Sequence, residues 1–326
     1  MKKQTIINSF KGIAIGDAFG VGIEFKSRLW MPNNVHFDTY VNVWKGGQNN
    51  ITPGTYSDDT EHSIGVIRAL LSNEPFSKDL LLRMFKNEYE SDKMFKGFGR
   101  DGHGSIEDWY KGTKTIDEVR AAQASREDPG NAPVMRALPL CYIEKGQVYK
   151  YACINADATH PNEMGRKASL LTVLTAWHFL RENGDRSDLI SFLRAYIGMI
   201  DVKEMLDKID ELPPPNQLTE ENYLFLHGPQ PLPYIKWDTN IYGLPCAAMK
   251  TAMNVVYVLK HSTNAFEALQ YAINMGGDVD SLAAVCTGIA GGKYGLDSLP
   301  AFMLEQTEGL ARLERLGGEV YKKFFS

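Results

Sequence analysis

Two short acidic clusters, far apart in the chain, hold the side chains best suited to chemistry. The first is Ser57-Asp58-Asp59-Thr60 and the second is Asp278-Val279-Asp280-Ser281. Together they offer four carboxylates and two serine hydroxyls, an all-oxygen ligand set of the kind that magnesium and manganese ions prefer. If the fold brings the clusters together, their like charges repel each other unless cations lie between them. The clusters therefore either cap two separate helices or meet around metal.

Helix capping is the simpler interpretation of each cluster. Both clusters precede an apolar segment with helical periodicity, and Ser and Asp are favoured at helix starts because their oxygens accept hydrogen bonds from unpaired amides. For residues 57–60 alone, capping is the preferred interpretation. For residues 278–281, helix capping and metal binding are equally good interpretations. Gly276 and Gly277 permit the turn that would direct both aspartates of this cluster to one ion.

A glycine-rich segment near the N-terminus adds two further carboxylates. Glycines recur there every four residues, which predicts one face of close helix packing: Gly12, Gly16 and Gly20. Glycines at 288, 291 and 292 would let another helix approach in the same way. Asp17 lies inside the apolar stretch, and we expect it to accept hydrogen bonds from a nearby loop. Glu24 follows a glycine-rich turn and is either a general base facing a cleft or a surface carboxylate.

Two other segments have the composition of a nucleotide site. Residues 95–105 combine four glycines with Arg100 and two aromatic residues, so this loop either cradles a pyrophosphate through its amides or is a mobile surface loop. His160, before Pro161, either bonds ribose hydroxyls or forms part of a helix entry. Neither segment matches a Walker A or Rossmann fingerprint.

Helical periodicity dominates the chain and predicts a mainly α-helical single domain over residues 1–326. It extends over residues 4–19, 60–72, 164–182, 187–200, 246–260, 264–274, 281–291 and 300–324. Residues 164–182 are apolar almost all round, so we expect a central helix there. Strand alternation is weak and confined to residues 35–37 and 40–44. The proline-rich segment near 211–235 is interpreted as an insertion within the domain.

Composition excludes several broad classes of protein. A hydrophobic content of 44% in 326 residues allows a large core, and a net charge of -5 argues against broad electrostatic binding of nucleic acid. No uninterrupted apolar stretch approaches the ~20 residues that span a bilayer. The cysteines form no CxxC pair and are expected to be buried thiols in a reducing compartment: Cys141, Cys153, Cys246 and Cys286.

Taken in order, these pieces resemble the ADP-ribosylglycohydrolase family, which includes DraG-type bacterial enzymes and their eukaryotic relatives. The likeness runs from about Gly12 to Pro300. It is carried by Gly16-Asp17-Ala18 with Glu24, by residues 53–60, by Gly130-Asn131 with Met135-Arg136, by Thr159-His160-Pro161, and by residues 276–281 with Ala290-Gly291-Gly292 and Tyr294-Gly295. Each motif is weak alone, but five in the same order are specific.

The resemblance implies an all-α globular fold with two magnesium or manganese ions at the base of a cleft. The implied metal ligands are Ser57, Asp58, Asp59, Asp278, Asp280 and Ser281. The implied catalytic residues are Glu24, Asp59 and Asp278. The implied ADP-ribose-binding residues are Phe98, Gly99, Gly102, His103, Gly104, Asn131 and His160.

This chain departs from the family pattern in two places. Serine stands at 57 and 281 where the family usually has threonine, which keeps the ligating oxygen but loses the methyl group that restricts its rotamer. Ala132-Pro133 replaces the commoner small pair after Asn131. With the proline-rich segment, the second departure bears on substrate choice more than on reaction type.

The activity that the resemblance implies is metal-dependent hydrolysis of the glycosidic bond between ADP-ribose and an acceptor, which reverses ADP-ribosylation. Arginine-linked protein is the first choice of substrate by analogy. The alternatives are a non-catalytic ADP-ribose-binding or toxin-immunity protein on the same fold, and a metal-dependent pyrophosphohydrolase. We expect a cytoplasmic monomer with no membrane partner, and nucleic acid only as a modified substrate.

Overall fold

The computed structural model describes residues 1–41, 52–96, 100, 102–235 and 238–326. Within these ranges the fold is all α-helical, as predicted, and none of the described residues forms a β-strand. The weak strand prediction at 35–37 is wrong, and that at 40–44 is wrong for residues 40 and 41, while 42–44 lie outside the described residues. Side chains hold this segment instead, since Phe37 stacks on Phe19 and Tyr40 bonds Thr307.

Seventeen α-helices are present in the described ranges. In chain order they are α1 (Lys3–Gly20), α2 (Met31–Asn34), α3 (Asp58–Leu71), α4 (Lys78–Lys96), α5 (Ser105–Tyr110), α6 (Ile116–Ala124), α7 (Ala132–Met135), α8 (Val148–Asp157), α9 (Glu163–Leu180), α10 (Leu189–Tyr196), α11 (Ile200–Glu211), α12 (Glu220–His227), α13 (Ala248–His261), α14 (Ala265–Asn274), α15 (Val279–Tyr294), α16 (Ala301–Gln306) and α17 (Leu310–Phe325). Short 3-10 turns are η1 (Val21–Ile23), η2 (Leu138–Tyr142), η3 (Lys145–Gln147), η4 (Arg186–Asp188) and η5 (Pro215–Gln217).

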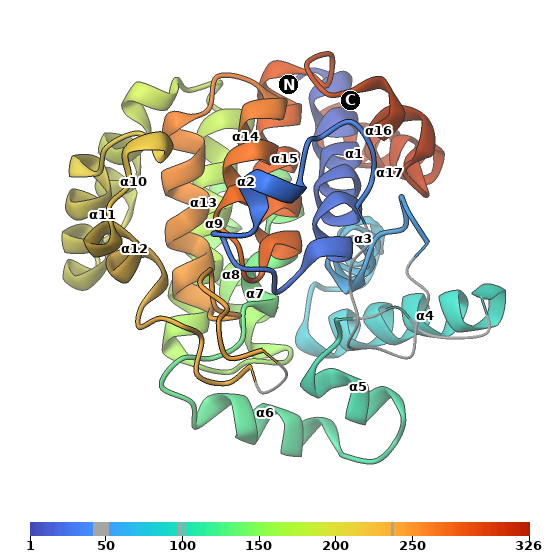
Figure 1. The fold of residues 1–326 in the computed structure, drawn as a ribbon. Helices are drawn as coiled ribbons and strands as arrows, with labels where there is room; N and C mark the ends of the chain where they lie inside the picture. The colour runs from blue at the N-terminus through green and yellow to red at the C-terminus, as the bar shows by residue number, and fades with distance from the viewer. Residues whose placement is uncertain (42–51, 97–99, 101, 236–237) are drawn as a thin grey trace.

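Helices α1 and α15 lie side by side and antiparallel at the centre of the molecule (Figure 1). Their backbones touch because glycine occupies the contact face of α1. A Cβ atom at Gly12 would lie 2.5 Å from the Thr287 carbonyl oxygen, and one at Gly16 would lie 2.1 Å from the Ala283 oxygen. The predicted close-packing face is therefore confirmed, and its partner is the helix that follows the second acidic cluster.

The remaining helices complete the core around this pair. Helix α9 is buried from Ala168 to Leu180, which confirms the central helix predicted at 164–182. Helices α13 and α14 pack against α15, and α10, α11 and α12 form an outer group on one side (Figure 1). The single helix predicted at 300–324 is instead two, α16 and α17. The break occurs at Gly309, which adopts a left-handed conformation with φ 75°.

The proline-rich segment at 211–235 contains more structure than its composition suggests. Thr219 closes a capping box at the start of α12, and α12 ends at His227 before Gly228. The Gln230–Pro231 peptide bond is cis, and residues 229 and 232–234 line the main cleft described below. The segment therefore forms part of a cleft wall. Its status as an insertion stays a prediction.

The span Lys3–Ile23 is long and apolar enough to cross a membrane by length and composition, with a mean hydropathy of 1.3. In this fold 89% of the 18-residue window for which the hydropathy is given is buried inside the protein. Contacts with α15 and α17 therefore account for its apolar character.

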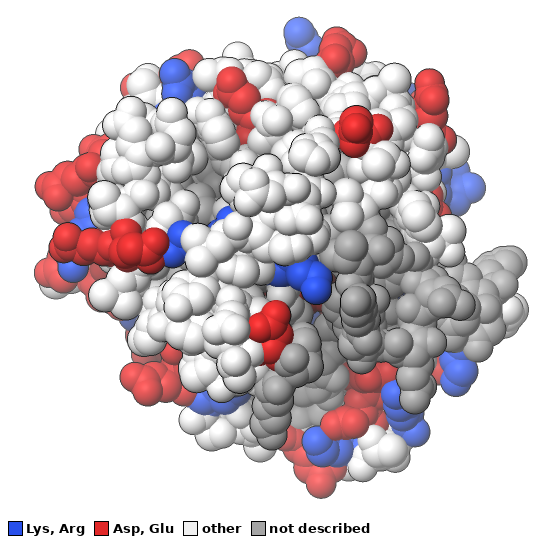
Figure 2. Space-filling model, in the orientation of Figure 1, with Lys and Arg blue, Asp and Glu red and all other residues white. Residues whose placement is uncertain are grey.

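The distribution of surface charge and the burial of the cysteines agree in part with what the composition predicted. On the face seen in Figure 2, the described Lys and Arg side chains are scattered among Asp and Glu and form no continuous basic surface. All four cysteines are free thiols. Cys141 and Cys286 are buried as expected, whereas Cys153 and Cys246 are partly exposed.

Candidate metal centre and substrate cleft

The two acidic clusters meet at the base of one cleft of about 600 Å³. Helix α3 begins at Asp58 and α15 begins at Val279, so each cluster lies at a helix N-terminus, where the helix dipole favours negative charge. The cleft is lined by Asp58, Asp59, Asp278, Asp280 and Ser281, with Glu24 beside them. The tertiary structure thus brings together carboxylates that lie more than 200 residues apart in the chain and leaves them open to a ligand.

Asp17 joins the two clusters from inside the core. Its Oδ1 accepts a hydrogen bond from the Ser57 amide at 2.9 Å, and its Oδ2 accepts from the amide and hydroxyl of Thr60 at 2.9 and 2.6 Å. The predicted role of Asp17 as an acceptor for a nearby loop is confirmed. Carboxylate oxygens of Asp17, Asp59 and Asp280 lie within 4.8 Å of one another, so Asp17 is also part of the acidic centre.

The capping interpretation holds for the first cluster and fails for the second. Ser57 is the N-cap of α3; its hydroxyl accepts from the Asp59 amide at 3.3 Å and donates to Asp59 Oδ2 at 3.2 Å. Asp278 occupies the N-cap position of α15, yet its side chain makes no capping bond. The Asp278 carboxylate is therefore available to a ligand.

Gly276 and Gly277 make the turn that directs the second cluster into the cleft. Both have positive φ, 65° and 75°, as the sequence predicted for a turn there. The backbone of Gly277 touches Leu244, where a Cβ atom would lie 2.2 Å from the carbonyl oxygen. The Asp278 amide also donates to the Leu244 carbonyl at 2.9 Å. Only glycine fits this approach, so the turn fixes where Asp278 points.

Burial and mutual repulsion disfavour the charged form of these carboxylates. Burial, assisted by Asp17, Glu61 and Asp278, raises the pKa of Asp58 to about 7, although His103 opposes the shift. Burial and neighbouring carboxylates also raise the pKa values of Asp59 and Asp280 well above 3.8. A group of buried acids with raised pKa values is typical of a functional site.

The donor set fits a hard divalent cation. Among the described residues, the buried atoms Asp59 Oδ1 and Asp280 Oδ1 have no hydrogen-bond partner. Buried polar atoms are almost always paired, so unpaired oxygens facing other carboxylates indicate a place for a cation. Ligands of this kind, all oxygen and mostly charged, suit magnesium or manganese.

Asn131, which also lines the cleft, supports the centre. Its side-chain amide donates to Asp278 Oδ2 at 2.9 Å and to Thr251 Oγ1 at 3.3 Å. We predicted Asn131 as a substrate-binding residue; it lines the cleft, and its amide orients a carboxylate of the centre. This contact had no signal in the sequence, because residues 131 and 278 are joined only by tertiary packing.

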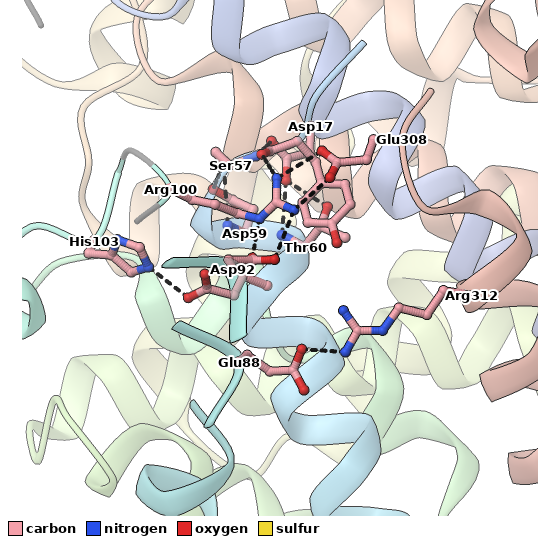
Figure 3. A network of polar contacts seen from close by, with 12 residues as sticks. Asp17, Ser57, Asp59, Thr60, Glu88, Asp92, Arg100, His103, Glu308 and Arg312 are labelled. Atoms are coloured by element: carbon pink, nitrogen blue, oxygen red, sulfur yellow. Dashed lines mark hydrogen bonds and ion pairs between the residues drawn. The ribbon is translucent and has the colours of Figure 1, made fainter. Parts of the chain in front are cut away.

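Arg100 anchors the glycine-rich loop to the centre (Figure 3). It pairs with Asp92 and Glu308, donates to the Tyr56 carbonyl at 2.7 Å and stacks 3.6 Å from the centroid of the Tyr56 ring. Gly102 then lies against Asp58, where a Cβ atom would be 1.9 Å from Oδ1. Gly102 thus brings backbone directly onto a carboxylate of the centre.

His103 lines the cleft, but its polar contact is internal. Its Nε2 lies 2.7 Å from Glu61 Oε1, and both side chains are almost fully buried. Burial alone would lower the pKa of His103, but the hydrogen bond to Glu61 and the negative charges of Glu61 and Asp58 together outweigh burial and raise that pKa. His103 therefore borders the cleft close to Asp58, with its Nε2 engaged by Glu61.

A chain of buried donors fixes the orientation of His160. The Arg136 guanidinium is fully buried and donates to Thr159 Oγ1 at 2.7 Å, and Thr159 Oγ1 lies 2.7 Å from His160 Nδ1. Since arginine can only donate, the Thr159 hydroxyl proton is left for Nδ1. Burial, helped by the charge of Arg136, lowers the pKa of His160 to about 3. The ring is thus neutral, with its proton on Nε2, beside Gly130 at the cleft wall.

The structure places most of the predicted site residues around one cleft. Those that line it are Glu24, Asp58, Asp59, Gly102, His103, Gly104, Asn131, His160, Asp278, Asp280 and Ser281. Ser57 does not line the cleft but is hydrogen-bonded to Asp59, which does. Phe98 and Gly99 lie outside the described residues. Three further lining residues, Gln123, Cys246 and Lys250, were not predicted, because no distinctive motif surrounds them in the sequence.

Comparison with known proteins finds a matching family, relatives in sequence and a solved structure of the same fold. A model of the ADP-ribosylglycohydrolase family matches residues 2–326. The chain is 26% identical to ADP-ribosylhydrolase ARH3 of Homo sapiens over 84% of this chain and 82% of that protein. It is 22% identical to ADP-ribosylarginine hydrolase Tri1 of Serratia proteamaculans over 95% and 77%. A solved structure titled "ADP-ribosylglycohydrolase-related protein complex" shares the fold, with a TM-score of 0.68, 19% identity and 98% of both chains covered.

Proposed function

This chain belongs to the ADP-ribosylglycohydrolase family, and we propose that it uses two magnesium or manganese ions to release ADP-ribose from modified arginine in proteins. The observation that carries the metal requirement is the meeting of two acidic helix N-termini around buried carboxylate oxygens without partners. The ions would be held by Asp58, Asp59, Asp278 and Asp280, with the Ser57 and Ser281 hydroxyls adjoining. Without cations this set of charges is costly, which supports a metal role over a purely structural one.

Arginine is the proposed acceptor for two reasons. A relative of which this chain covers 77% is named as an ADP-ribosylarginine hydrolase, and the cleft offers carboxylates that suit a guanidinium. Glu24 lies beside the centre and Asp128 lies exposed at the rim of the cleft. A guanidinium pairs well with carboxylates because of its planar array of donors.

The reaction is hydrolysis at C1″ of the ADP-ribose unit. Water adds its oxygen to C1″, the bond from C1″ to the arginine nitrogen breaks, and that nitrogen leaves with a proton. Bound cations would supply Lewis-acid polarisation of water and ribose hydroxyls. In this proposal Glu24 accepts the proton from water and passes it to the leaving nitrogen. Its carboxylate oxygen lies within 4.8 Å of one from Asp278, beside the centre.

Other residues would hold the substrate in place. His160 presents a neutral ring with Nε2–H as a fixed donor, suited to a ribose hydroxyl or phosphate oxygen. The backbone of the Gly102–Gly104 segment borders the same cleft and offers amide donors of the kind that bind phosphates.

The test is incubation with arginine-, serine- and DNA-linked ADP-ribose, with and without a chelator, followed by identification of the product. Asp278→Asn removes a carboxylate of the centre, and Asp297→Asn makes the same change at an exposed residue outside the cleft. We expect release of free ADP-ribose that is lost with chelator or Asp278→Asn and kept with Asp297→Asn. AMP with ribose phosphate would instead indicate pyrophosphate cleavage. Binding of ADP-ribose without turnover of any substrate would indicate a non-catalytic protein.

A further inference from the structure

A thiol lies at the edge of the acidic centre, at a position that the family motifs do not include. Cys246 stands just before α13 and lines the same cleft. Its Sγ, a carboxylate oxygen of Glu24 and a carboxylate oxygen of Asp278 all lie within 4.8 Å of one another. One metal ion could therefore reach all three ligands with small side-chain rotations.

The backbone builds this trio from three distant segments. Gly277 is the junction: its carbonyl accepts from the Phe25 amide at 2.8 Å, and its amide donates to the Lys26 carbonyl at 2.8 Å. On its other side, the Leu244 amide donates to the Gly276 carbonyl at 2.8 Å. These bonds place residue 24, residue 246 and residue 278 next to one another.

A further contact fixes Cys246 itself. Its amide donates to the hydroxyl of Tyr234 at 3.0 Å. Tyr234 belongs to the segment that forms the cleft wall, so the thiol is held by a framework and is not an isolated cysteine on a loose loop.

A further carboxylate oxygen in the cleft points to a ligand. Asp280 is 3% exposed, and its Oδ1 has no hydrogen-bond partner among the described residues. Asp280 lines the same cleft as Glu24 and Cys246. An unpaired buried oxygen therefore lies in the same cleft as the thiol.

We propose that Cys246, Glu24 and Asp278 form a second type of metal site, which takes zinc or cadmium in preference to magnesium. Thiolate is a soft ligand that selects zinc and cadmium, whereas magnesium prefers oxygen and dehydrates reluctantly. A mixed set of one sulfur and two carboxylates therefore favours the softer ion. On binding, the thiol gives up its proton to solvent and the ion gains a sulfur–metal bond.

The site has a consequence that rests on the proposed function. Asp278 belongs both to this trio and to the all-oxygen centre, so an ion bound to Cys246 competes for that carboxylate. Zinc is then an inhibitor of the magnesium- or manganese-supported reaction, and the thiol makes the enzyme sensitive to it.

Binding is tested without substrate. The full-length protein is titrated with cadmium and with cobalt while the thiolate-to-metal charge-transfer absorption is recorded. The variants are Cys246→Ser, Cys246→Ala and, as the matched control, Cys153→Ser at the other partly exposed cysteine. We expect one saturable band in the wild type and in Cys153→Ser, and none in the two Cys246 variants. Absence of the band in the wild type, or its survival in both Cys246 variants, overturns the proposal.

Calorimetry with zinc gives the second readout. Removal of a direct ligand should weaken binding by at least the roughly 10- to 100-fold seen when outer-shell partners are removed. Cys246→Ser and Asp278→Asn should both show this loss, and Asp297→Asn should not. Equal zinc affinity in the wild type and Cys246→Ser overturns the proposal.

Failure of this site and failure of the proposed function are distinguishable. A charge-transfer band that depends on Cys246 in a protein that hydrolyses no ADP-ribose linkage supports the site and removes the activity. Hydrolysis that zinc inhibits equally in the wild type and Cys246→Ser keeps the activity and removes the inhibitory role of the thiol.

Discussion

The contact between α1 and α15 allows a sharp prediction, because one methyl group at Gly16 should loosen both the core and the acidic centre. In Gly16→Ala the new Cβ would lie 2.1 Å from the Ala283 oxygen, 2.4 Å from its carbonyl carbon and 2.8 Å from the Ala284 amide nitrogen. All three atoms are backbone, so no side-chain rotation relieves the clash. The helices must separate by at least 0.9 Å for the shortest contact to reach 3.0 Å.

The energy of this separation can be bracketed. Overpacking a closely packed core costs about 1–3 kcal/mol, and the absence of a flexible neighbour favours the upper end of that range. Replacing glycine by alanine restores about 0.4–1 kcal/mol because the unfolded chain has less freedom to lose. The net expectation is a loss of about 2 kcal/mol in the free energy of unfolding.

The same movement should reach the metal centre. Asp17 follows Gly16, and Asp280 lies one turn before Ala283, so the separation displaces two carboxylates that lie within 4.8 Å of each other. A misplacement of about 1 Å can reduce activity by about 100-fold. We therefore expect weaker manganese binding and a large loss of hydrolysis.

Gly146→Ala is the matched control, because a Cβ atom at residue 146 meets no atom within 4 Å. It should leave metal binding unchanged and raise stability by about 0.4–1 kcal/mol. Urea unfolding with chelator present and calorimetry with manganese measure both quantities. Should Gly16→Ala match Gly146→Ala in stability and metal affinity, the two helices do not pack as described.

Four further predictions follow from the site. Burial raises the pKa of Asp58 from 3.8 to about 7, so between these pH values the folded protein holds more protons than the unfolded chain. In the presence of chelator, the free energy of unfolding should therefore fall from about pH 4 to 7, while manganese affinity rises over the same interval. A gain of stability in urea unfolding over that interval contradicts this prediction. Thr159→Val removes the hydroxyl that holds the proton of His160 on Nε2, so it should mix the two tautomers and weaken ADP-ribose binding, whereas Thr159→Ser should keep both properties. Nitrogen-15 NMR of the ring reports the tautomer. An unchanged spectrum in Thr159→Val argues against the hydrogen-bond assignment. Gly102→Ala should weaken manganese binding because its Cβ would meet Asp58 at 1.9 Å, and Gly112→Ala, which has a positive φ but no neighbour within 4 Å, separates this clash from backbone strain. Ser57→Thr keeps the hydroxyl and should leave manganese affinity equal or slightly higher; a large loss in calorimetry shows that the ligand geometry at residue 57 is different.

Several parts of the fold were predictable from the sequence because they depend on local pattern. The glycine spacing at 12, 16 and 20 predicted a close-packing helix face, and the apolar run at 164–182 predicted a central helix. Asp17 was identifiable as a buried acceptor because a single carboxylate inside an apolar helix needs donors. Each of these follows from spacing within one or two helical turns.

Other features depend on residues that no local pattern links. Asn131 reaches Asp278, and Arg100 reaches Glu308, across more than 140 positions in each case. The break of the last predicted helix depends on the left-handed conformation of Gly309, which lies against Tyr56. Helical periodicity carries no information about such contacts.

The acidic residues themselves show where this division falls. Their types alone determined that the site would favour hard cations, since carboxylate and hydroxyl oxygens have that preference wherever they lie. Only the packed molecule decided that residues 57–60 and 278–281 share one centre, and that Asp278 lines the cleft instead of capping its helix. The reason is that ligand preference is a property of each side chain, whereas the distance between two distant side chains is set by how the helices between them pack.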